Sequence, residues 1–500
     1  MQNPTPNQKR MALDVEENPK KISEWILFAL QHVLAMLVAC ITVPLLTGLP
    51  VAATIVSAGI GTLIYLLFTK KKSPVFLSSS FAYLSPMFSA LGVGAIYNAA
   101  GDAVPGYAAV AIGMISVGLV YAIVAIVIKF VGTKWLSKLL PPIVVGPIIM
   151  VIGLSLSGSA INNLVGGPIQ VSEGVWGSGF NWIAVICGLI AMVTVALCSH
   201  YGKKMVALIP FVIGMGAGYV AAALFTVFGY YIGGNNYFHI IDFTKFTDIF
   251  THFEFSSIFN YKMFVPNDGE SFIFLRLESW AAFPWDKIGT VLLLFVPVAF
   301  VTICEHVGDH ENLGNILGRD LLNGEPGMHR TLLGDGIATA ASGVLCGAAN
   351  TTYGENVAVI GTTKIASVNV VFLAAIFSIV FGFFTPFTKL LETIPGCVTG
   401  GVSLILYGFI ASSGVKMLLA EKINFNESRN IFIASVILVA GIGGLTFYFG
   451  NPNSPVITIT SIAVAMILGI LMNLILKEKK NEAPAIEASA EEPAEEPEQE

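Results

Sequence analysis

Long apolar runs recur along this chain of 500 residues, from Trp25 to the stretch VITITSIAVAMILGILMNLIL at 456–476. Many of them reach the roughly 20 residues that an α-helix needs to cross about 30 Å of hydrocarbon. Charged residues make up only 12% of the chain, whereas a typical soluble domain carries roughly 25%. These features predict an all-α polytopic membrane protein.

Counting the apolar runs predicts 14 transmembrane segments. The third, ninth and tenth are interrupted by Ser, Thr, Gly and Asn. The predicted segments are 24–46, 51–69, 75–93, 107–131, 139–157, 180–199, 205–231, 287–308, 331–348, 350–366, 367–388, 394–415, 429–448 and 456–476.

The distribution of Lys and Arg supports this count. With the N-terminus inside, the inside loops are basic, whereas the outside loops 94–106 and 158–179 contain no Lys or Arg. We therefore expect a multi-pass protein of the cell (inner) membrane with both termini in the cytoplasm.

The domain organisation follows from these spans. We predict a cytoplasmic N-terminal tail at 1–23, a transmembrane transporter domain at 24–476 and a cytoplasmic acidic tail at 477–500. Within that tail, residues 481–500 hold eight glutamates and no Lys or Arg, a composition typical of disorder. The aromatic-rich extracellular loop 232–286 is predicted to lie on the membrane surface or to cap the protein.

An internal repeat is visible in the sequence. LPPIVVGPIIMVIG at 140–153 resembles IPGCVTGGVSLILYG at 394–408, and these stretches lie seven spans apart. Because seven is odd, a duplicated unit of seven spans must be inverted relative to its partner. We expect two inverted repeats of seven, at about 24–231 and 287–476, an organisation frequent in secondary transporters.

The interrupted third and tenth spans lie at matching positions of the two repeats. Each begins with small or β-favouring polar residues and continues as a possible helix. Unwound backbone at membrane depth is tolerated inside protein or beside a cavity, and the following half-helix would aim free N–H groups at a ligand. Alternatively, these Ser and Thr residues only permit close helix packing.

Three carboxylates lie within the apolar segments. Glu305 and Asp309 are spaced i, i+4 on one helical face, and Glu355 lies in the tenth span. A carboxylate at the bilayer centre costs about 2.5–3.5 kcal/mol and by default faces a functional cavity. The alternatives are a helix end that reaches water for Asp309 and a buried structural hydrogen bond for Glu305 and Glu355.

The histidines next to these carboxylates give no comparable indication of a functional site. His306 points to another face of the same helix and is interpreted as structural. His310 and Glu311 are interpreted as solvated residues at the helix end.

The sequence shows no catalytic or metal-binding motif that would favour another class of function. The six cysteines lie in or beside apolar segments without CxxC spacing and are interpreted as small core residues. We find no nucleophile elbow, no Walker A pattern and no clustered metal ligands. We therefore expect neither an enzyme nor a cofactor or metal site.

Two stretches carry a family resemblance. CEHVGDHENLGNILGRDLLNGEPGMHRTLLGDGIATAASGVLCGAANTTYGENVAVIGTTK at 304–364 resembles the uracil permeases of the nucleobase–ascorbate transporter family, also called nucleobase:cation symporter type 2. LFALQHVLAMLVACITVPLL at 27–46 is similar to the first span of that family. The family signature corresponds to Glu355-Asn356-Val357-Ala358 and Thr363-Lys364, with Ala358 where the family usually has Gly.

The resemblance implies a fold and a site. It implies core and gate domains, short strands in spans 3 and 10, a central uracil and a homodimer. Glu305 and Glu355 match substrate carboxylates, and Phe81 and Gly354 match positions whose backbone amides reach the base. Further positions that the resemblance places at the substrate are Tyr353, Asn356 and Tyr407.

The resemblance also bears on ion coupling. Asp309 occupies a position where related uracil permeases have a histidine associated with proton coupling. We expect that role to fall to Asp309 together with Glu305. H⁺ is the favoured coupling ion, and Na⁺ remains open.

The predicted function is uptake of uracil across the plasma membrane by proton symport with alternating access. The expected partners are a nucleobase and membrane lipid, and no nucleic acid. A purine or xanthine permease of the same fold is the alternative. An ion channel lined by the three carboxylates is a weaker one.

Overall fold

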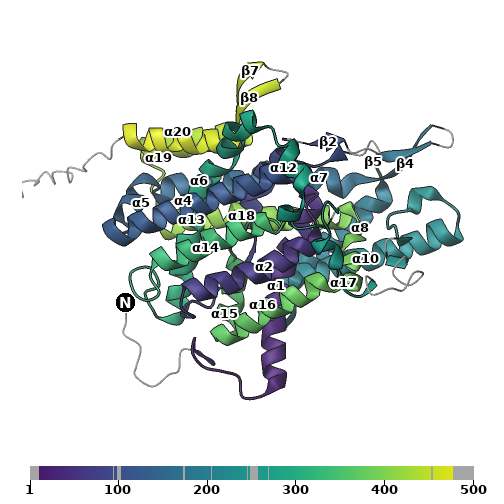
Figure 1. Cartoon of the computed structure of the whole chain (residues 1–500), viewed down its shortest axis with the longest axis horizontal. Coiled ribbons are helices and arrows are strands. Elements are labelled where there is room, and N and C mark those ends of the chain that lie inside the picture. The colour runs from purple at the N-terminus through teal and green to yellow at the C-terminus, as the bar shows by residue number, and fades with distance from the viewer. Residues whose placement is uncertain are drawn as a thin grey trace, which may run out of the picture.

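The computed structural model describes residues 11–476, apart from 94, 98–102, 173–174, 204, 245, 248–256, 269 and 452–453. Helices that lie alongside one another make up most of it (Figure 1). The acidic tail predicted at 477–500 and the first ten residues of the N-terminal tail lie outside the described residues.

Eight helical segments of the described chain are long and apolar enough to cross a membrane. They are α1 (Ile22–Thr47), α2 (Val51–Phe68), α4 (Tyr107–Val131), α6 with α7 (Pro142–Ser155 and Ser157–Val165), α8 (Trp182–Tyr201), α10 with the π-helical η2 (Pro210–Phe225 and Thr226–Ile232), α13 (Ile288–Leu317) with the turn before it, and α18 (Gly396–Ala420).

Shorter elements complete the helical body. The shorter helices are α3 (Leu84–Leu91), α5 (Lys134–Leu139), α9 (Met205–Leu208), α12 (Leu277–Ala282), α14 (Met328–Val344), α15 (Gly354–Thr363), α16 (Val368–Phe383), α17 (Thr385–Glu392), α19 (Ser428–Ile442) and α20 (Ser461–Ile475). The strands form two-stranded antiparallel sheets, which pair β1 (Leu77–Ser79) with β6 (Asn350–Thr352), β2 (Ile96–Tyr97) with β3 (Ala103–Val104), β4 (Gly166–Ser172) with β5 (Val175–Phe180), and β7 (Phe447–Asn451) with β8 (Ser454–Ile459).

The predicted helical membrane class is confirmed, although several predicted bounds were wrong. Each predicted span contains a helix, but α13 continues nine residues beyond 308 because its polar residues lower the hydropathy without interrupting the helix. Part of the predicted outside loop 158–179 is helical, since α7 reaches Val165. The last predicted span begins as strand β8, whose β-branched residues favour an extended backbone.

The helices pack as two groups. The first helix group contains α1 to α4 and α13 to α16, in which α2 packs on α16 and α4 packs on α14. The second helix group contains α6, α7, α8, α10, α18, α19 and α20, in which α6 packs on α18. Small residues bring the helices close: a Cβ built on Gly118 of α4 would lie 2.6 Å from the carbonyl oxygen of Gly336 on α14.

The loop at 232–286 covers the ends of helices from the first helix group. The N–H of Asn260 donates to the carbonyl oxygen of Phe383 at 2.9 Å, at the end of α16. The guanidinium of Arg276 lies 4.1 Å from the centre of the Tyr107 ring, at the start of α4. The described part of this loop therefore packs on the ends of α16 and α4, and its extracellular position stays a prediction.

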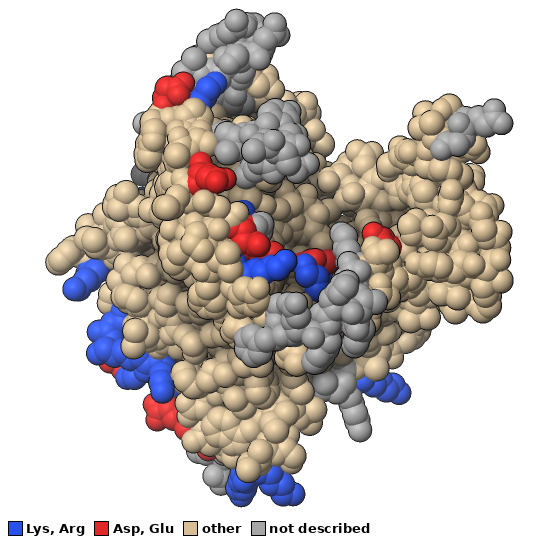
Figure 2. Space-filling model, turned by 45° about the vertical axis from the view of Figure 1, so that its right-hand side comes forward, with Lys and Arg blue, Asp and Glu red and all other residues tan. Residues whose placement is uncertain are grey.

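The outer surface is apolar over wide areas. In Figure 2, uncharged residues cover most of the visible face, and charged side chains gather near its margins and in one central patch. On α4 a row of large apolar side chains is exposed, namely Leu119, Ile123, Ile126 and Phe130. Such a surface is suited to contact with lipid. All six cysteines are free, and all but Cys198 are buried, as predicted.

Candidate functional site

Strands β1 and β6 pair at the centre of the first helix group. Their register places Leu77 opposite Thr352 and Ser79 opposite Asn350. Both strands are fully buried. Apart from Leu77, the residues of Leu-Ser-Ser and Asn-Thr-Thr are weak helix formers, which makes an extended backbone more favourable here. Because the strands pair with each other, backbone that is not helical satisfies its hydrogen bonds within the protein.

Side chains from the surrounding helices hold these strands. Thr62 on α2 accepts a hydrogen bond from the N–H of Leu77 at 3.0 Å. The side-chain amide of Asn350 donates to the carbonyl oxygen of Ser57 on α2 at 2.8 Å, and Thr339 on α14 donates to the carbonyl oxygen of Asn350. These buried hydroxyl and amide groups fix the strands, and none of them was predicted from the sequence as a site residue.

A half-helix follows each strand and begins with a free donor. Phe81 opens the turn Phe81–Tyr83 (η1) that leads into α3, and Gly354 is the first residue of α15. Among the described residues, neither the Phe81 N–H nor the Gly354 N–H has a hydrogen-bond acceptor. Unpaired N–H groups at helix starts bind carbonyl oxygens and anions. The two predicted amide donors are therefore available.

The three predicted carboxylates lie near one another and are partly accessible. Glu305 and Asp309 project from α13, and Glu355 lies in the first turn of α15. All three side chains are half-buried. The charges of Asp309 and Glu355 act on Glu305, and a Cβ built on Gly354 would lie 3.3 Å from Oδ1 of Asp309. The site thus joins acceptors from α13 to the start of α15.

Aromatic residues connect the two helix groups beside these carboxylates. The rings of Phe81 and Tyr407 meet edge to face, with centroids 6.1 Å apart, and Tyr407 belongs to α18 of the second helix group. The Tyr83 hydroxyl lies 2.8 Å from Oγ1 of Thr302, one turn before Glu305 on α13. The structure therefore places Phe81 close to α13 and at the boundary between the two helix groups.

The remaining predicted residues lie at the start of α15. Tyr353 precedes this helix and is buried. Asn356 is also buried, and His32 of α1 lies with Nδ1 2.9 Å from its Oδ1. Among the described residues, Nδ2 of Asn356 has no hydrogen-bond partner. His32 thus orients Asn356, and the amide retains a donor.

A fully buried histidine network occupies the other face of α13. His306 Nδ1 lies 2.7 Å from Asp335 Oδ2 on α14, and the His310 ring stacks on the His306 ring with centroids 4.1 Å apart. The Tyr65 hydroxyl of α2 lies 2.6 Å from His310 Nε2. The interpretation of His306 as structural agrees with this network. The interpretation of His310 as solvated was wrong, because α13 extends beyond it and α2 covers it.

A cavity of about 340 Å³ adjoins the third side of α13. Cys304, Val307 and Glu311 of α13 line it, together with Val145 of α6 and Met417 of α18. It therefore lies between the two helix groups. Among the described residues that line it there is none of the predicted substrate contacts. Nor do the described residues contain a group of three or more His, Cys, Asp or Glu side chains that could hold a metal ion.

The profile of the Permease family matches residues 23–450 of this chain. The match spans the first helix group, the second helix group except α20, and all of the site described above. The chain belongs to the Permease family. The predicted family resemblance is thereby confirmed.

Similar proteins of known name cover nearly the whole chain. A uracil permease of Bacillus caldolyticus is 38% identical over 464 residues, which cover 93% of this chain and 94% of that protein. A uracil permease of Bacillus subtilis (strain 168) is 36% identical and covers 95% of this chain and 98% of its own length. A uracil permease of Escherichia coli (strain K12) is 33% identical, with 94% of each chain covered.

Solved structures show a related fold at low sequence identity. The transmembrane domain of the cyanobacterial bicarbonate transporter BicA has a TM-score of 0.55 at 13% identity, and it covers 92% of this chain and 98% of that domain. The murine anion transporter Slc26a9 in its inward-facing state has a TM-score of 0.58 at 11% identity, covering 92% of this chain and 69% of that protein. At such low identity the likeness concerns the fold alone.

Proposed function

We propose that this protein imports uracil across the plasma membrane by proton symport with alternating access. The observation that carries the proposal is the grouping of free backbone N–H donors at Phe81 and Gly354 with the half-buried carboxylates Glu305 and Glu355. It is supported by the uracil permeases that match over nearly the full chain. Their name denotes transport and not an enzymatic reaction.

The chemistry of uracil suits these groups. Uracil presents two ring N–H donors and two carbonyl acceptors in one plane. The carboxylates of Glu305 and Glu355 accept from the N–H groups, and the free N–H groups of Phe81 and Gly354 donate to the carbonyls. The unpaired Nδ2 of Asn356 is a further donor, while Phe81 and Tyr407 supply apolar walls. Such a site rejects analogues that lack a donor, because its own buried groups remain unpaired.

We propose that the 14 segments form two inverted repeats of seven, which supply a core and a gate domain. The order α1, α2, β1 with α3, and α4 recurs later as α13, α14, β6 with α15, and α16. These eight helices are the first helix group and would form the core. The second helix group would form the gate. Rocking of one group against the other around a fixed site is the usual form of alternating access.

Ion coupling is assigned to Asp309 together with Glu305. Asp309 lies one helical turn beyond Glu305 and beside Gly354, so its charge acts on both the substrate carboxylate and the amide donor. Protonation of Asp309 or Glu305 would remove a negative charge from the site when uracil binds. H⁺ is the coupling ion in this proposal, and replacement by Na⁺ is an outcome of the test below.

We propose a homodimer with both termini in the cytoplasm. The orientation is supported by the basic residues of the loops that would lie inside and by the absence of Lys and Arg from 94–106 and 158–179.

Uptake of radiolabelled uracil by vesicles that contain the purified protein tests the function. We expect saturable uptake that unlabelled uracil suppresses and that an inward proton gradient drives. Suppression by adenine, guanine or xanthine but not by uracil would identify a purine permease instead. Uptake driven only by a sodium gradient would identify Na⁺ as the coupling ion. Ion current without any base would indicate a channel.

A further inference from the structure

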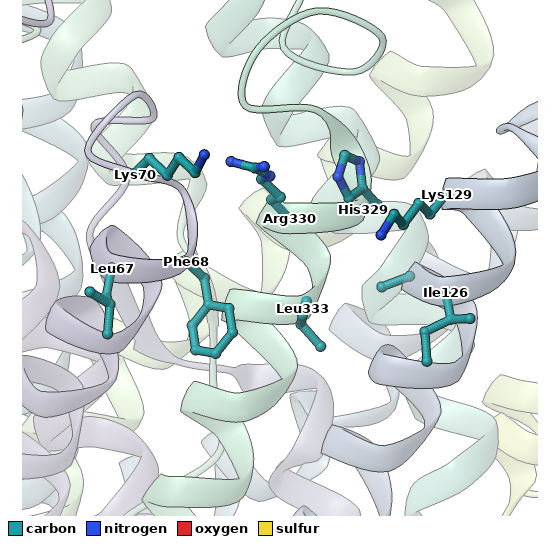
Figure 3. Close-up of a pocket in the computed structure, with 9 residues that line it drawn as sticks. Leu67, Phe68, Lys70, Ile126, Lys129, His329, Arg330 and Leu333 are labelled. Carbon is teal, nitrogen blue, oxygen red and sulfur yellow. The ribbon is translucent and has the colours of Figure 1, made fainter.

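A second cavity, of about 510 Å³, lies on the first helix group where α2, α4 and α14 meet at one end. Four nitrogen-bearing side chains lie in a row above it, and apolar side chains lie beneath them (Figure 3). The upper row is Lys70, Lys129, His329 and Arg330, the labelled lower residues are Leu67, Phe68, Ile126 and Leu333, and Ala125 also lines the cavity. None of these residues belongs to the proposed uracil site.

The positive charges at this cavity have no acidic partner within the described part of the chain, and Nζ of Lys129 lies 5.8 Å from the centre of the Phe130 ring. Among the described residues, no acidic side chain forms an ion pair with Lys70, Lys129 or Arg330, although nearby Lys72 is paired with Glu325. Figure 3 shows the ends of Lys70 and Arg330 pointing toward each other. Burial, and after it the charges of Arg330 and Lys129, lower the pKa of His329. This concentration of like charge is unfavourable until an anion enters.

The lower part of the cavity opens onto the apolar surface. Leu67 is 75% exposed and Ile126 is 55% exposed, and Ile126 continues the row of exposed apolar side chains along α4. Ala125 of α4 and Leu333 of α14 add further apolar lining. The cavity therefore combines a cationic rim with an apolar groove that runs into the surface suited to lipid.

We propose that this cavity is a binding site for an anionic phospholipid of the surrounding membrane. The phosphate lies between Lys70, Lys129 and Arg330, and one acyl chain lies along Phe68, Leu333 and Ile126. Basic pockets between transmembrane helices bind anionic head groups in this way, and Arg adds bidentate contacts to phosphate. The apolar lining favours a lipid over a free anion. The positive-inside distribution assigns the site to the cytoplasmic leaflet.

The site is tested with the full chain, purified in a neutral detergent. Dioleoylphosphatidylglycerol and dioleoylphosphatidylcholine are titrated separately, and bound lipid is measured by native mass spectrometry together with the midpoint of thermal unfolding. We expect phosphatidylglycerol to bind and raise the midpoint, and phosphatidylcholine to do so much less. Each cation removed should weaken phosphatidylglycerol binding about five-fold, so Lys70→Gln/Lys129→Gln/Arg330→Gln should weaken it about 100-fold.

A matched variant controls for the loss of net charge. Lys20→Gln/Lys138→Gln/Lys416→Gln removes three exposed cations that lie elsewhere on the described chain. It should bind phosphatidylglycerol as the parent does. Equal loss of binding in both triple variants would overturn the proposal, because the attraction would then be nonspecific, as would equal binding of the two lipids by the parent.

A third variant separates a lipid from a free anion. Ile126→Trp narrows the groove at an exposed position and leaves every cation in place. It should weaken phosphatidylglycerol binding at least about five-fold without changing the small effect of inorganic phosphate. If inorganic phosphate raises the unfolding midpoint as much as the lipid does, and Ile126→Trp changes neither, the cavity is a site for free anions and the proposal fails.

Discussion

The ionisable residues on the two faces of α13 differ in exposure and in hydrogen bonding. On one face, Glu305 and Asp309 are half-buried and point toward the start of α15. On the adjacent face, His306 and His310 are 0% exposed; α14 supplies hydrogen-bond partners for His306, and α2 supplies one for His310. The first face retains unused hydrogen-bonding capacity, which a ligand can take up. On the second face, both ring nitrogens of His306 and of His310 already have hydrogen-bond partners within the protein.

This difference separates binding from stability. A side chain with accessible hydrogen-bonding capacity should change ligand affinity when it is replaced, with little effect on folding. A fully buried side chain in a hydrogen-bonded network should do the reverse, because its loss leaves a partner unpaired. One helix therefore offers both kinds of test in the same membrane environment.

The largest expected effect is the loss of stability on breaking the buried network. His306→Ala leaves Asp335 without its partner at 2.7 Å in a region with no exposure. We expect the free energy of unfolding to fall by about 4 kcal/mol, because Asp335 and Thr331 each lose a hydrogen-bond partner in a buried region. Thermal unfolding of the purified variants measures this. His200→Ala on the exposed side of α8 is the matched control and should be near neutral.

A nearly unchanged unfolding midpoint in His306→Ala would contradict the assignment of this face to stability. The two faces of α13 would then no longer differ, and the histidines would need a role in transport.

Glu355→Gln should have the next largest effect, and on binding only. Replacing a carboxylate that accepts from a ring N–H should weaken uracil binding by about 3 kcal/mol, or roughly 100-fold. Equilibrium binding of radiolabelled uracil and thermal unfolding should be measured on the same preparation. Glu311→Gln, at an exposed position of α13, is the control and should bind uracil normally.

Glu305→Gln should resemble Glu355→Gln, since both acceptors are needed for the two ring N–H groups. Near-normal uptake by a well-folded Glu355→Gln protein would refute the proposed site. A gain of purine transport would show that this position of the family signature sets specificity.

The sequence indicated one face of α13 better than the other. The Glu305 and Asp309 spacing and the Ser- and Thr-rich starts of spans 3 and 10 are local patterns, and the structure places those residues as a group. The partners of His310 lie 245 residues away on α2, so no local pattern could reveal them. The polar run from Glu305 to Glu311 also lowered the hydropathy and made the helix seem to end before His310.

The strand supports were missed for a related reason. Thr62 and Thr339 are each flanked by small or apolar residues within a helix, where Thr is common and usually bonds its own helix. Only the tertiary fold shows that they also hold Leu77 and Asn350.

The Asp309→Asn variant separates uracil binding from proton coupling on the accessible face of α13. Asn keeps the size of Asp but carries no exchangeable acidic proton, so uracil binding should remain near normal while proton-driven accumulation is lost. A tenfold proton gradient supplies about 1.4 kcal/mol, so the parent should concentrate uracil up to about tenfold and the variant should not. Gradient-driven uptake in vesicles, beside equilibrium binding, measures both properties.

Asp309→His is the companion variant. Imidazole carries its proton as a cation with an unperturbed pKa of about 6.5, so some coupling should persist with a shifted pH dependence. If Asp309→Asn accumulates uracil as well as the parent, Asp309 is only a helix residue that faces water, and the coupling proton belongs to a glutamate.

The smallest expected effect concerns a carboxylate outside the membrane spans, whose partner is a full positive charge. Glu270 lies 2.7 Å from Lys389 and 2.5 Å from the side-chain amide of Asn260. Burial alone would raise the pKa of Glu270, but the charge of Lys389 and these hydrogen bonds outweigh it and hold the pKa below its usual value.

The direction of the pH dependence follows from that lowered pKa. The pair stabilises the fold fully above the pKa of the unfolded chain, about 4.5. The contribution is lost as the pH falls below that value and through the lower pKa of the folded protein. For a partly exposed pair it should amount to about 1 kcal/mol. The parent should therefore be more stable than Glu270→Gln at pH 7, and the two unfolding midpoints should converge as the pH approaches 3. A constant difference between the two proteins across this range would mean that the ion pair contributes nothing and that Glu270, like His306, is held by neutral hydrogen bonds.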